Sequence, residues 1–234
     1  MNQVIAVHGW AGDATVWRTW QRRFEHQGWH WQSFERGYGT NEPHQPSWSQ
    51  PNSGQRVVMA HSLGLHLIPS AVLSGASAVV SLACFSRFVP DGPAGRRLRT
   101  ALKAMASKLG TAQEAGMLQT FLERCALPHP VTALPANPLL QGLAPPGRGR
   151  LQQDLVLLQH CSQLPANWPE QAAVLVVQGE QDAIVCDQSR KGLLQDLPVG
   201  RFQQISLPND GHALVTPSVL ALVQNWVEKW VENV

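Results

Sequence analysis

The segment Arg56-Val57-Val58-Met59-Ala60-His61-Ser62-Leu63-Gly64 gives the strongest indication of how this chain folds. Its first five residues form a largely apolar run that is typical of a buried parallel strand, and residues 63–73 favour a helix. A serine between small residues at such a strand-to-helix turn can stand at the carboxyl edge of a sheet as a nucleophile. Glycine is usual two positions before that serine, and Ala60 is small enough to replace it. Ser62 is therefore our candidate nucleophile.

Strand and helix alternate on both sides of this segment. Because parallel strands are joined by helices that cover both faces of the sheet, we expect an α/β fold with about six mostly parallel strands. Pro69 should bend or shorten the helix after Ser62, since proline removes a helical hydrogen bond. The predicted strands are residues 4–7, 30–35, 56–60, 78–83, 173–177 and 202–207, and the predicted helices outside the long insertion are 14–27, 63–73 and 216–231. The last helix has an apolar stripe formed by Val219, Leu222, Val223, Trp226, Val227 and Trp230.

Two segments interrupt the alternation. Residues 37–55 are rich in Pro, Ser, Asn and Gln, which is typical of a loop. Residues 87–168 lie between two predicted strands and are far longer than one crossover needs; 98–109 and 115–125 within them have helical patterns, and Pro-rich stretches follow. We predict that 87–168 form a cap, and that 1–86 and 169–234 together form the sheet-containing core.

An acid and a base follow two later strands. Asp182 comes after the fifth strand in Gly179-Glu180-Gln181-Asp182, and His212 follows the sixth in Asp210-Gly211-His212. Carboxyl ends of parallel strands meet at one edge of a sheet, so both side chains should approach Ser62 there. The chain order Ser, Asp, His is the order found when such a triad is built on this kind of sheet. His212 would take the serine proton and Asp182 would orient the imidazole. Asp210 is the alternative acid.

A negatively charged oxygen that develops during attack by Ser62 needs hydrogen-bond donors already in position. The backbone N–H of Leu63, directly after the nucleophile, is one candidate. The backbone N–H of Trp10, in the glycine-containing loop 8–12 after the first strand, is the second. His61 has a simpler interpretation as a packing residue than as a second base.

Composition limits the remaining functions. The 234 residues are 44% hydrophobic and 15% charged, with a net charge of +2, which argues against disorder and against a general nucleic-acid binder. The four cysteines show no zinc-ligand spacing, so we expect no metal and no cofactor. The chain starts without a signal-peptide pattern and contains no apolar run of membrane-helix length, which predicts a cytoplasmic protein.

These motifs together resemble the capped α/β-hydrolases. Within that superfamily, the segment from His8 to Trp17, the segment 60–64, Cys84-Phe85-Ser86 and the positions of Asp182 and His212 are similar to the pimeloyl-[acyl-carrier protein] methyl ester carboxylesterases of biotin synthesis. The resemblance implies a serine esterase that cleaves the methyl ester of pimeloyl-carrier protein. It also implies that the first two strands of the full eight-stranded sheet are absent.

The resemblance further implies roles for individual residues. Ser62, Asp182 and His212 would form the triad, Trp10 and Leu63 would bind the ester carbonyl, and Phe121 and Leu122 would line the acyl channel. Other activities on the same scaffold stay open: a general short-chain carboxylesterase, a C–C bond hydrolase or a menaquinone-pathway lyase. A receptor that binds a small ligand on this fold is a further alternative.

Charge is unevenly distributed along the chain. Residues 87–160 carry nine Lys and Arg against four Asp and Glu, a formal charge of +5, whereas the rest of the chain carries −3. A basic cap would attract an acidic partner, and acyl carrier proteins are strongly acidic. The candidate docking residues, densest on one predicted helix, are Arg96, Arg97, Arg99 and Lys103.

Overall fold

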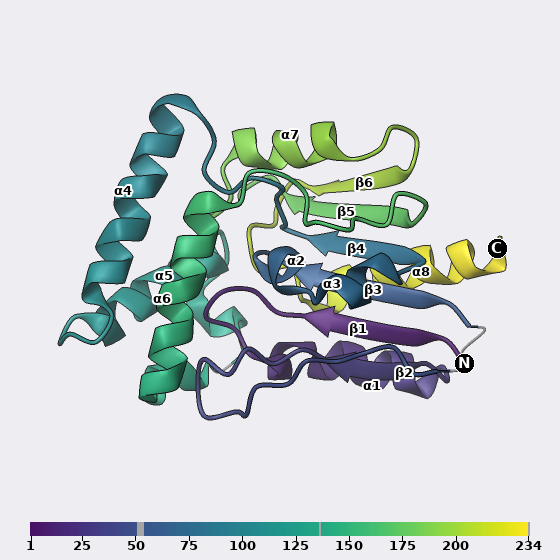
Figure 1. The fold of residues 1–234 in the computed structure, drawn as a ribbon, viewed down its shortest axis with the longest axis horizontal. Helices are drawn as coiled ribbons and strands as arrows, with labels where there is room; N and C mark the ends of the chain where they lie inside the picture. Colours follow the sequence, from purple (N-terminus) through teal and green to yellow (C-terminus); the bar gives the residue numbers. More distant parts are fainter. Residues whose placement is uncertain (51–53, 136, 234) are drawn as a thin grey trace.

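A computed structural model describes residues 1–50, 54–135 and 137–233. Its centre is a six-stranded sheet with the order β2-β1-β3-β4-β5-β6, and every pairing between neighbouring strands is parallel (Figure 1). The predicted parallel α/β sheet is therefore confirmed. The strands are β1 (Gln3–Val7), β2 (His30–Ser33), β3 (Arg56–His61), β4 (Ala78–Leu82), β5 (Ala173–Gly179) and β6 (Phe202–Leu207).

The edge strand β2 ends two residues earlier than predicted. Glu35 pairs instead with His44 in an isolated antiparallel bridge, so the chain turns away from the sheet after Phe34. This turn starts the loop predicted for 37–55, of which residues 51–53 lie outside the described part of the chain.

Helices cover both faces of the sheet. Successive side chains of a strand point to opposite faces, and on the inner strands most side chains on both faces are apolar. On β1, Val4 and Ala6 pack with α1 (Arg18–His26) and α8 (Pro217–Glu232). Ile5 and Val7 point to the opposite face. There they pack with α2 (Gly64–Leu67), α3 (Ser70–Ser74) and α7 (Asp187–Asp196). The parallel sheet is thus buried on both sides.

The prediction of one helix over residues 63–73, bent or shortened at Pro69, is wrong. The chain forms two short helices, α2 and α3, separated at Ile68 and Pro69. Ile68 is extended, with φ −61° and ψ 130°, because a residue before proline avoids the helical region. Pro69 therefore ends the first helix and precedes the second.

The other predicted core helices form with local differences. Residues 14–17 form a 3₁₀ turn, η1 (Ala14–Trp17), before α1 begins, and Asp13 caps it by accepting from the Thr15 N–H. The buried face of α8 differs from the predicted apolar stripe. It includes Leu220 and Gln224, whereas Leu222 of the predicted stripe is 38% exposed. None of the helices within the described ranges is both long and apolar enough to cross a membrane.

Three long helices between β4 and β5 lie beyond the ends toward which the strand arrows point (Figure 1). Two of them, α4 (Gly92–Lys108) and α5 (Glu114–Ala126), contain the predicted helical patterns. The third, α6 (Pro145–His160), forms in a Pro-rich stretch for which we predict no helix; its two prolines occupy the first turn, where proline is tolerated. Two 3₁₀ turns, η2 (Val131–Ala133) and η3 (Pro138–Gln141), connect α5 to α6. A separate apolar cluster joins these helices to the core through Leu102, Leu118, Leu151, Leu155, Trp10 and Phe85.

Candidate active site

Ser62, Asp182 and His212 meet at the carboxyl edge of the sheet. Ser62 follows β3, Asp182 follows β5 and His212 follows β6. The His212 Nε2 lies 3.0 Å from the Ser62 Oγ, and the His212 Nδ1 lies 2.9 Å from the Asp182 Oδ2. Both distances are those of hydrogen bonds, so the three groups form one continuous hydrogen-bonded chain, in which His212 can take the Ser62 proton and Asp182 orients the imidazole.

The backbone at Ser62 is held in a tight turn. Ser62 has φ +55°, a left-handed conformation that is uncommon for any residue but glycine, and its N–H donates to the Leu82 carbonyl at 2.9 Å. Gly64 is required next to it, because a Cβ there would lie 2.5 Å from the Val7 carbonyl oxygen. Such strain at a strand-to-helix turn is typical of a nucleophile that must stand clear of the sheet. Ala60 fits this turn and is fully buried.

The structure places Asp182, and not Asp210, against the histidine. The Asp182 Oδ1 accepts the backbone N–H groups of Ile184 and Val185 at 2.7 and 2.8 Å, which leaves the Oδ2 for His212. Burial acts to raise the pKa of Asp182, but the adjacent imidazole and the backbone donors outweigh it and hold the pKa below its usual value. Asp210 instead lies 3.5 Å from the Nε2 of His129.

His61 contacts the histidine of the triad without replacing it. Its Nε2 lies 2.9 Å from the His212 carbonyl oxygen. Burial, together with repulsion from His212, lowers the pKa of His61 to about 3. A neutral imidazole bonded to the backbone of His212 supports that loop, which agrees with a packing role.

The two candidate donors for the oxyanion have free N–H groups. In the described part of the chain, neither the Trp10 nor the Leu63 backbone N–H donates to another protein group. Leu63 precedes α2, so its N–H is one of the unpaired groups at a helix start. Gly9 lets the Trp10 loop approach, since a Cβ on Gly9 would lie 3.0 Å from the Ser62 Cβ.

Two cavities meet at Ser62. The first, of about 590 Å³, lies between α4 and α5 and is lined mainly by apolar side chains such as Leu102, Met105 and Met117. The second, of about 540 Å³, lies beside the loop 8–13 and includes His129 and Asn137. Ester substrates have an acyl part and an alcohol part, and two cavities on either side of one serine could hold one part each.

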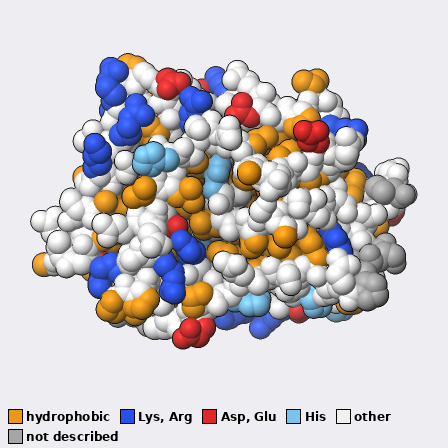
Figure 2. All heavy atoms as spheres, in the orientation of Figure 1, with side chains coloured by type: hydrophobic (Ala, Val, Ile, Leu, Met, Phe, Trp, Pro, Cys, Tyr) orange, Lys and Arg blue, Asp and Glu red, His pale blue; other side chains and the backbone are white. Residues whose placement is uncertain are grey.

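The predicted cap residues fall in two places. Phe121 lines both cavities and meets Trp10 edge-on, with ring centroids 4.8 Å apart. Leu122 lines the second cavity only. The four basic residues lie on α4, where their side chains are exposed and make no ion pair within the described ranges. Lys and Arg side chains gather over this part of the molecule in Figure 2.

Several contacts of the site carried no signal in the sequence. The indole Nε1 of Trp10 donates to the carbonyl of Leu151 on α6 at 3.0 Å, and Asp154 on the same helix is buried. Leu151 and Asp154 belong to no recognisable sequence motif, so only their burial and their partners in the structure identify them. Among the described residues, no group of three or more His, Cys, Asp or Glu could hold a metal ion.

No family model matches this chain, and no curated protein matches its sequence. Solved structures do resemble it. A hydrolase from Oleispira antarctica is 13% identical, with a TM-score of 0.71 over 100% of this chain and 92% of that one. An esterase from Exiguobacterium antarcticum is 13% identical, with a TM-score of 0.69 over 99% and 92%. MenH from S. aureus is 14% identical, with a TM-score of 0.66 over 97% and 94%.

These neighbours are α/β-hydrolases. The chain has the α/β-hydrolase fold. At identities of 13–14%, what these proteins share with this chain is the architecture. In that architecture, ligands bind outside the carboxyl ends of the strands, which is where Ser62, Asp182 and His212 lie.

Two substitutions of Trp10 test its backbone N–H and its side chain separately. Trp10→Pro removes the N–H, and we expect kcat for ester hydrolysis to fall by about 10²–10³, the usual cost of losing one oxyanion donor. Trp10→Phe loses the indole hydrogen bond to Leu151 but keeps the backbone N–H and an aromatic ring, so it should retain substantial activity, far more than Trp10→Pro. Steady-state kinetics on a chromogenic ester measure both. Equally mild losses in the two variants would show that the second donor lies elsewhere.

Proposed function

We propose that this protein is a carboxylic ester hydrolase that works through a serine acyl-enzyme. The observation that carries the proposal is the pair of hydrogen-bond distances at His212, 3.0 Å to the Ser62 Oγ and 2.9 Å to the Asp182 Oδ2. A serine hydroxyl is a weak nucleophile, and a base in this position is what activates it.

The proposed reaction has two halves. In the first, the Ser62 Oγ attacks the ester carbonyl while His212 takes its proton, and the Trp10 and Leu63 N–H groups stabilise the oxyanion. His212 then gives the proton to the departing alkoxide, which leaves as the alcohol, and the acyl group stays on Ser62. In the second half His212 deprotonates a water molecule that attacks the acyl-enzyme, which releases the carboxylic acid and restores Ser62. Asp182 stabilises the imidazolium in both halves. These groups supply every proton transfer, so the proposal includes no cofactor.

The substrate that we propose is the methyl ester of a pimeloyl chain carried by an acyl carrier protein, as the sequence resemblance implies. Two features support a long acyl substrate on an acidic carrier. The cavity between α4 and α5 is apolar and reaches Ser62, and Phe121 lines it. The exposed basic residues lie on α4, whose inner side lines the same cavity. A carrier docked there would direct its phosphopantetheine arm toward the nucleophile.

Reversing the charge of the four basic residues on α4 tests whether an acyl carrier protein docks there. Arg96, Arg97, Arg99 and Lys103 changed together to Glu should raise KM for a carrier-protein ester, most strongly at low salt, since exposed charges act over about 10 Å at 0.1 M ionic strength. Hydrolysis of a small neutral ester should stay nearly unchanged, because that substrate needs no docking. An equal loss of activity on both substrates would contradict docking of a carrier protein on α4.

The remaining alternatives give different kinetics. Offering the pimeloyl-carrier methyl ester and free short-chain esters side by side separates a carrier-dependent enzyme from a general carboxylesterase. A receptor on the same fold would leave no acyl-enzyme, so it would show no burst of product with a chromogenic ester. Turnover of neither ester, with binding retained, would contradict the proposed function.

A further inference from the structure

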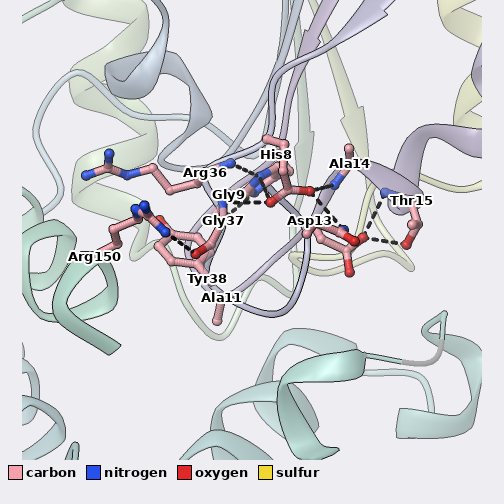
Figure 3. Close-up of polar contacts among 12 residues, drawn as sticks. His8, Gly9, Ala11, Asp13, Ala14, Thr15, Arg36, Gly37, Tyr38 and Arg150 are labelled. Carbon is pink, nitrogen blue, oxygen red and sulfur yellow. Dashed lines mark hydrogen bonds and ion pairs between the residues drawn. The ribbon is translucent and has the colours of Figure 1, made fainter. Parts of the chain in front are cut away.

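The direction of the Trp10 N–H is set by the carbonyl of Gly9. These two groups belong to one planar trans peptide and therefore point in opposite directions. The Gly9 oxygen lies 2.9 Å from the His8 Nδ1 and accepts the Gly12 N–H at 3.2 Å. Because a carbonyl oxygen can only accept, the His8 Nδ1 donates to Gly9. The other ring nitrogen of this buried imidazole, Nε2, lies 3.2 Å from the backbone nitrogen of Arg36 and 3.7 Å from the Glu35 Oε1. Figure 3 shows His8, Gly9 and Arg36 side by side.

Arg36 connects this peptide to the cap. Its guanidinium donates to both carboxylate oxygens of Asp154 on α6, at 2.7 and 2.8 Å. The Tyr38 hydroxyl donates to the same carboxylate at 2.6 Å. Burial raises the pKa of Tyr38 well above its usual value, so the phenol stays protonated. Asp154 is 2% exposed, and a carboxylate buried to that degree is stable only with such partners.

Helix α6 docks on this segment without space between the two backbones. A Cβ on Gly147 would lie 1.8 Å from the Tyr38 carbonyl oxygen, and Arg150 donates to the Gly37 carbonyl at 2.8 Å. Gly149, two residues further along the helix, has no atom within 4 Å of the position of its Cβ. Only one of the two glycines is thus required by the contact.

The side chain of Trp10 is attached to the same helix. Its indole donates to the Leu151 carbonyl, so Trp10 is fixed at its backbone through His8 and at its ring through α6. The contacts form a closed loop that runs from α6 through Asp154, Arg36 and His8 to Trp10 and back to α6.

We infer that α6 is a positioning element of the oxyanion hole, in which Asp154 and the close approach at Gly147 hold the Arg36–Tyr38 segment so that the Trp10 N–H faces Ser62. Asp154 is a positioning residue, since it acts through Arg36 and His8. The inference rests on the proposed ester hydrolysis and extends it: the cap contributes to stabilisation of the transition state as well as to the acyl cavity.

Asp154→Asn tests the link, with Glu114→Gln as its matched control. Glu114 forms a similar two-pronged pair with Arg148 of α6, at 2.6 and 2.9 Å, but that pair ties α6 to α5 and leaves the contacts of α6 with the Arg36–Tyr38 segment in place. We expect Asp154→Asn to lower kcat by about 10-fold to 10²-fold with little change in KM, a part of the cost of losing one oxyanion donor. Affinity for a boronic acid that mimics the tetrahedral intermediate should fall by the same factor. Glu114→Gln should leave kcat unchanged.

Gly147→Ala and Gly149→Ala form a second matched pair on the same helix. The first forces α6 away from Tyr38 and should lower kcat as Asp154→Asn does, whereas the second meets open space and should leave kcat at the wild-type value. If Asp154→Asn and a folded Gly147→Ala both keep the kcat of their controls, the inference is wrong. A lower Tm with unchanged kcat would likewise overturn it, because that result shows a purely structural contact.

The Trp10 backbone amide resonance, measured by ¹⁵N–¹H NMR without substrate, tests the positioning independently of turnover. It should shift in Asp154→Asn and Gly147→Ala and stay in place in the two controls. A wild-type protein that hydrolyses no ester and is not labelled at Ser62 by a fluorophosphonate would contradict the proposed function. An unshifted Trp10 resonance in both test variants would contradict the positioning role of α6 alone.

Discussion

Ser62→Ala should lower kcat for ester hydrolysis by about 10⁴–10⁶ while the protein stays folded, the scale seen when the nucleophile of a serine triad is removed. The loss is large because His212 then has no hydroxyl to deprotonate, and no acyl-enzyme can form. Within the described residues the Ser62 Oγ has one protein partner, His212, so its removal should cost the fold little.

The measurement combines kinetics with mass spectrometry. Wild-type protein mixed with a slowly deacylated ester should gain the acyl mass on the peptide that contains Ser62, and the variant should gain none. Ser86→Ala is a suitable control, since Ser86 is a fully buried serine whose hydroxyl has no partner in the described structure. Ser62→Ala with a near wild-type rate would overturn the assignment of the nucleophile.

Asp182→Asn should lower kcat by about 10⁴, the size of effect known for amide replacement of a triad acid. The reason is visible in the hydrogen bonds of Asp182. Its Oδ1 is held by the N–H groups of Ile184 and Val185, so the oxygen of an asparagine would stay there and its NH₂ would face His212. That NH₂ donates to Nδ1, which moves the imidazole proton to Nε2, and the histidine can then no longer accept the proton of Ser62.

Asp210→Asn is the matched comparison on the other acidic candidate. Its carboxylate lies near His129 at 3.5 Å, a partly exposed contact, so we expect kcat within a few-fold of wild type. Kinetics of both variants on one chromogenic ester, with circular dichroism to confirm folding, decide between the two acids. A larger loss for Asp210→Asn would mean that Asp210 orients the histidine in the working enzyme.

Much of the architecture was predictable because its causes are local. Apolar runs of four to seven residues predict strands that are buried on both faces. Pro69 predicts a bent or shortened helix, although not the complete break between α2 and α3 at Ile68. Helix α6 was not predicted, and the reason is also local. Its first turn begins with two prolines and is followed by two glycines, a composition that favours loops unless tertiary packing overrides it.

The sequence by itself determined the parallel sheet and the candidate residues Ser62, Asp182 and His212, each directly after its own strand, because parallel strands bring their carboxyl ends to one edge. Only the tertiary structure decided which carboxylate faces His212, since Asp182 and Asp210 both lie in loops at that edge. It also decided that Asp154 meets Arg36, a contact across 118 residues of chain. No local pattern encodes such a contact, because a buried carboxylate gains its partner only when the cap helix packs on the core.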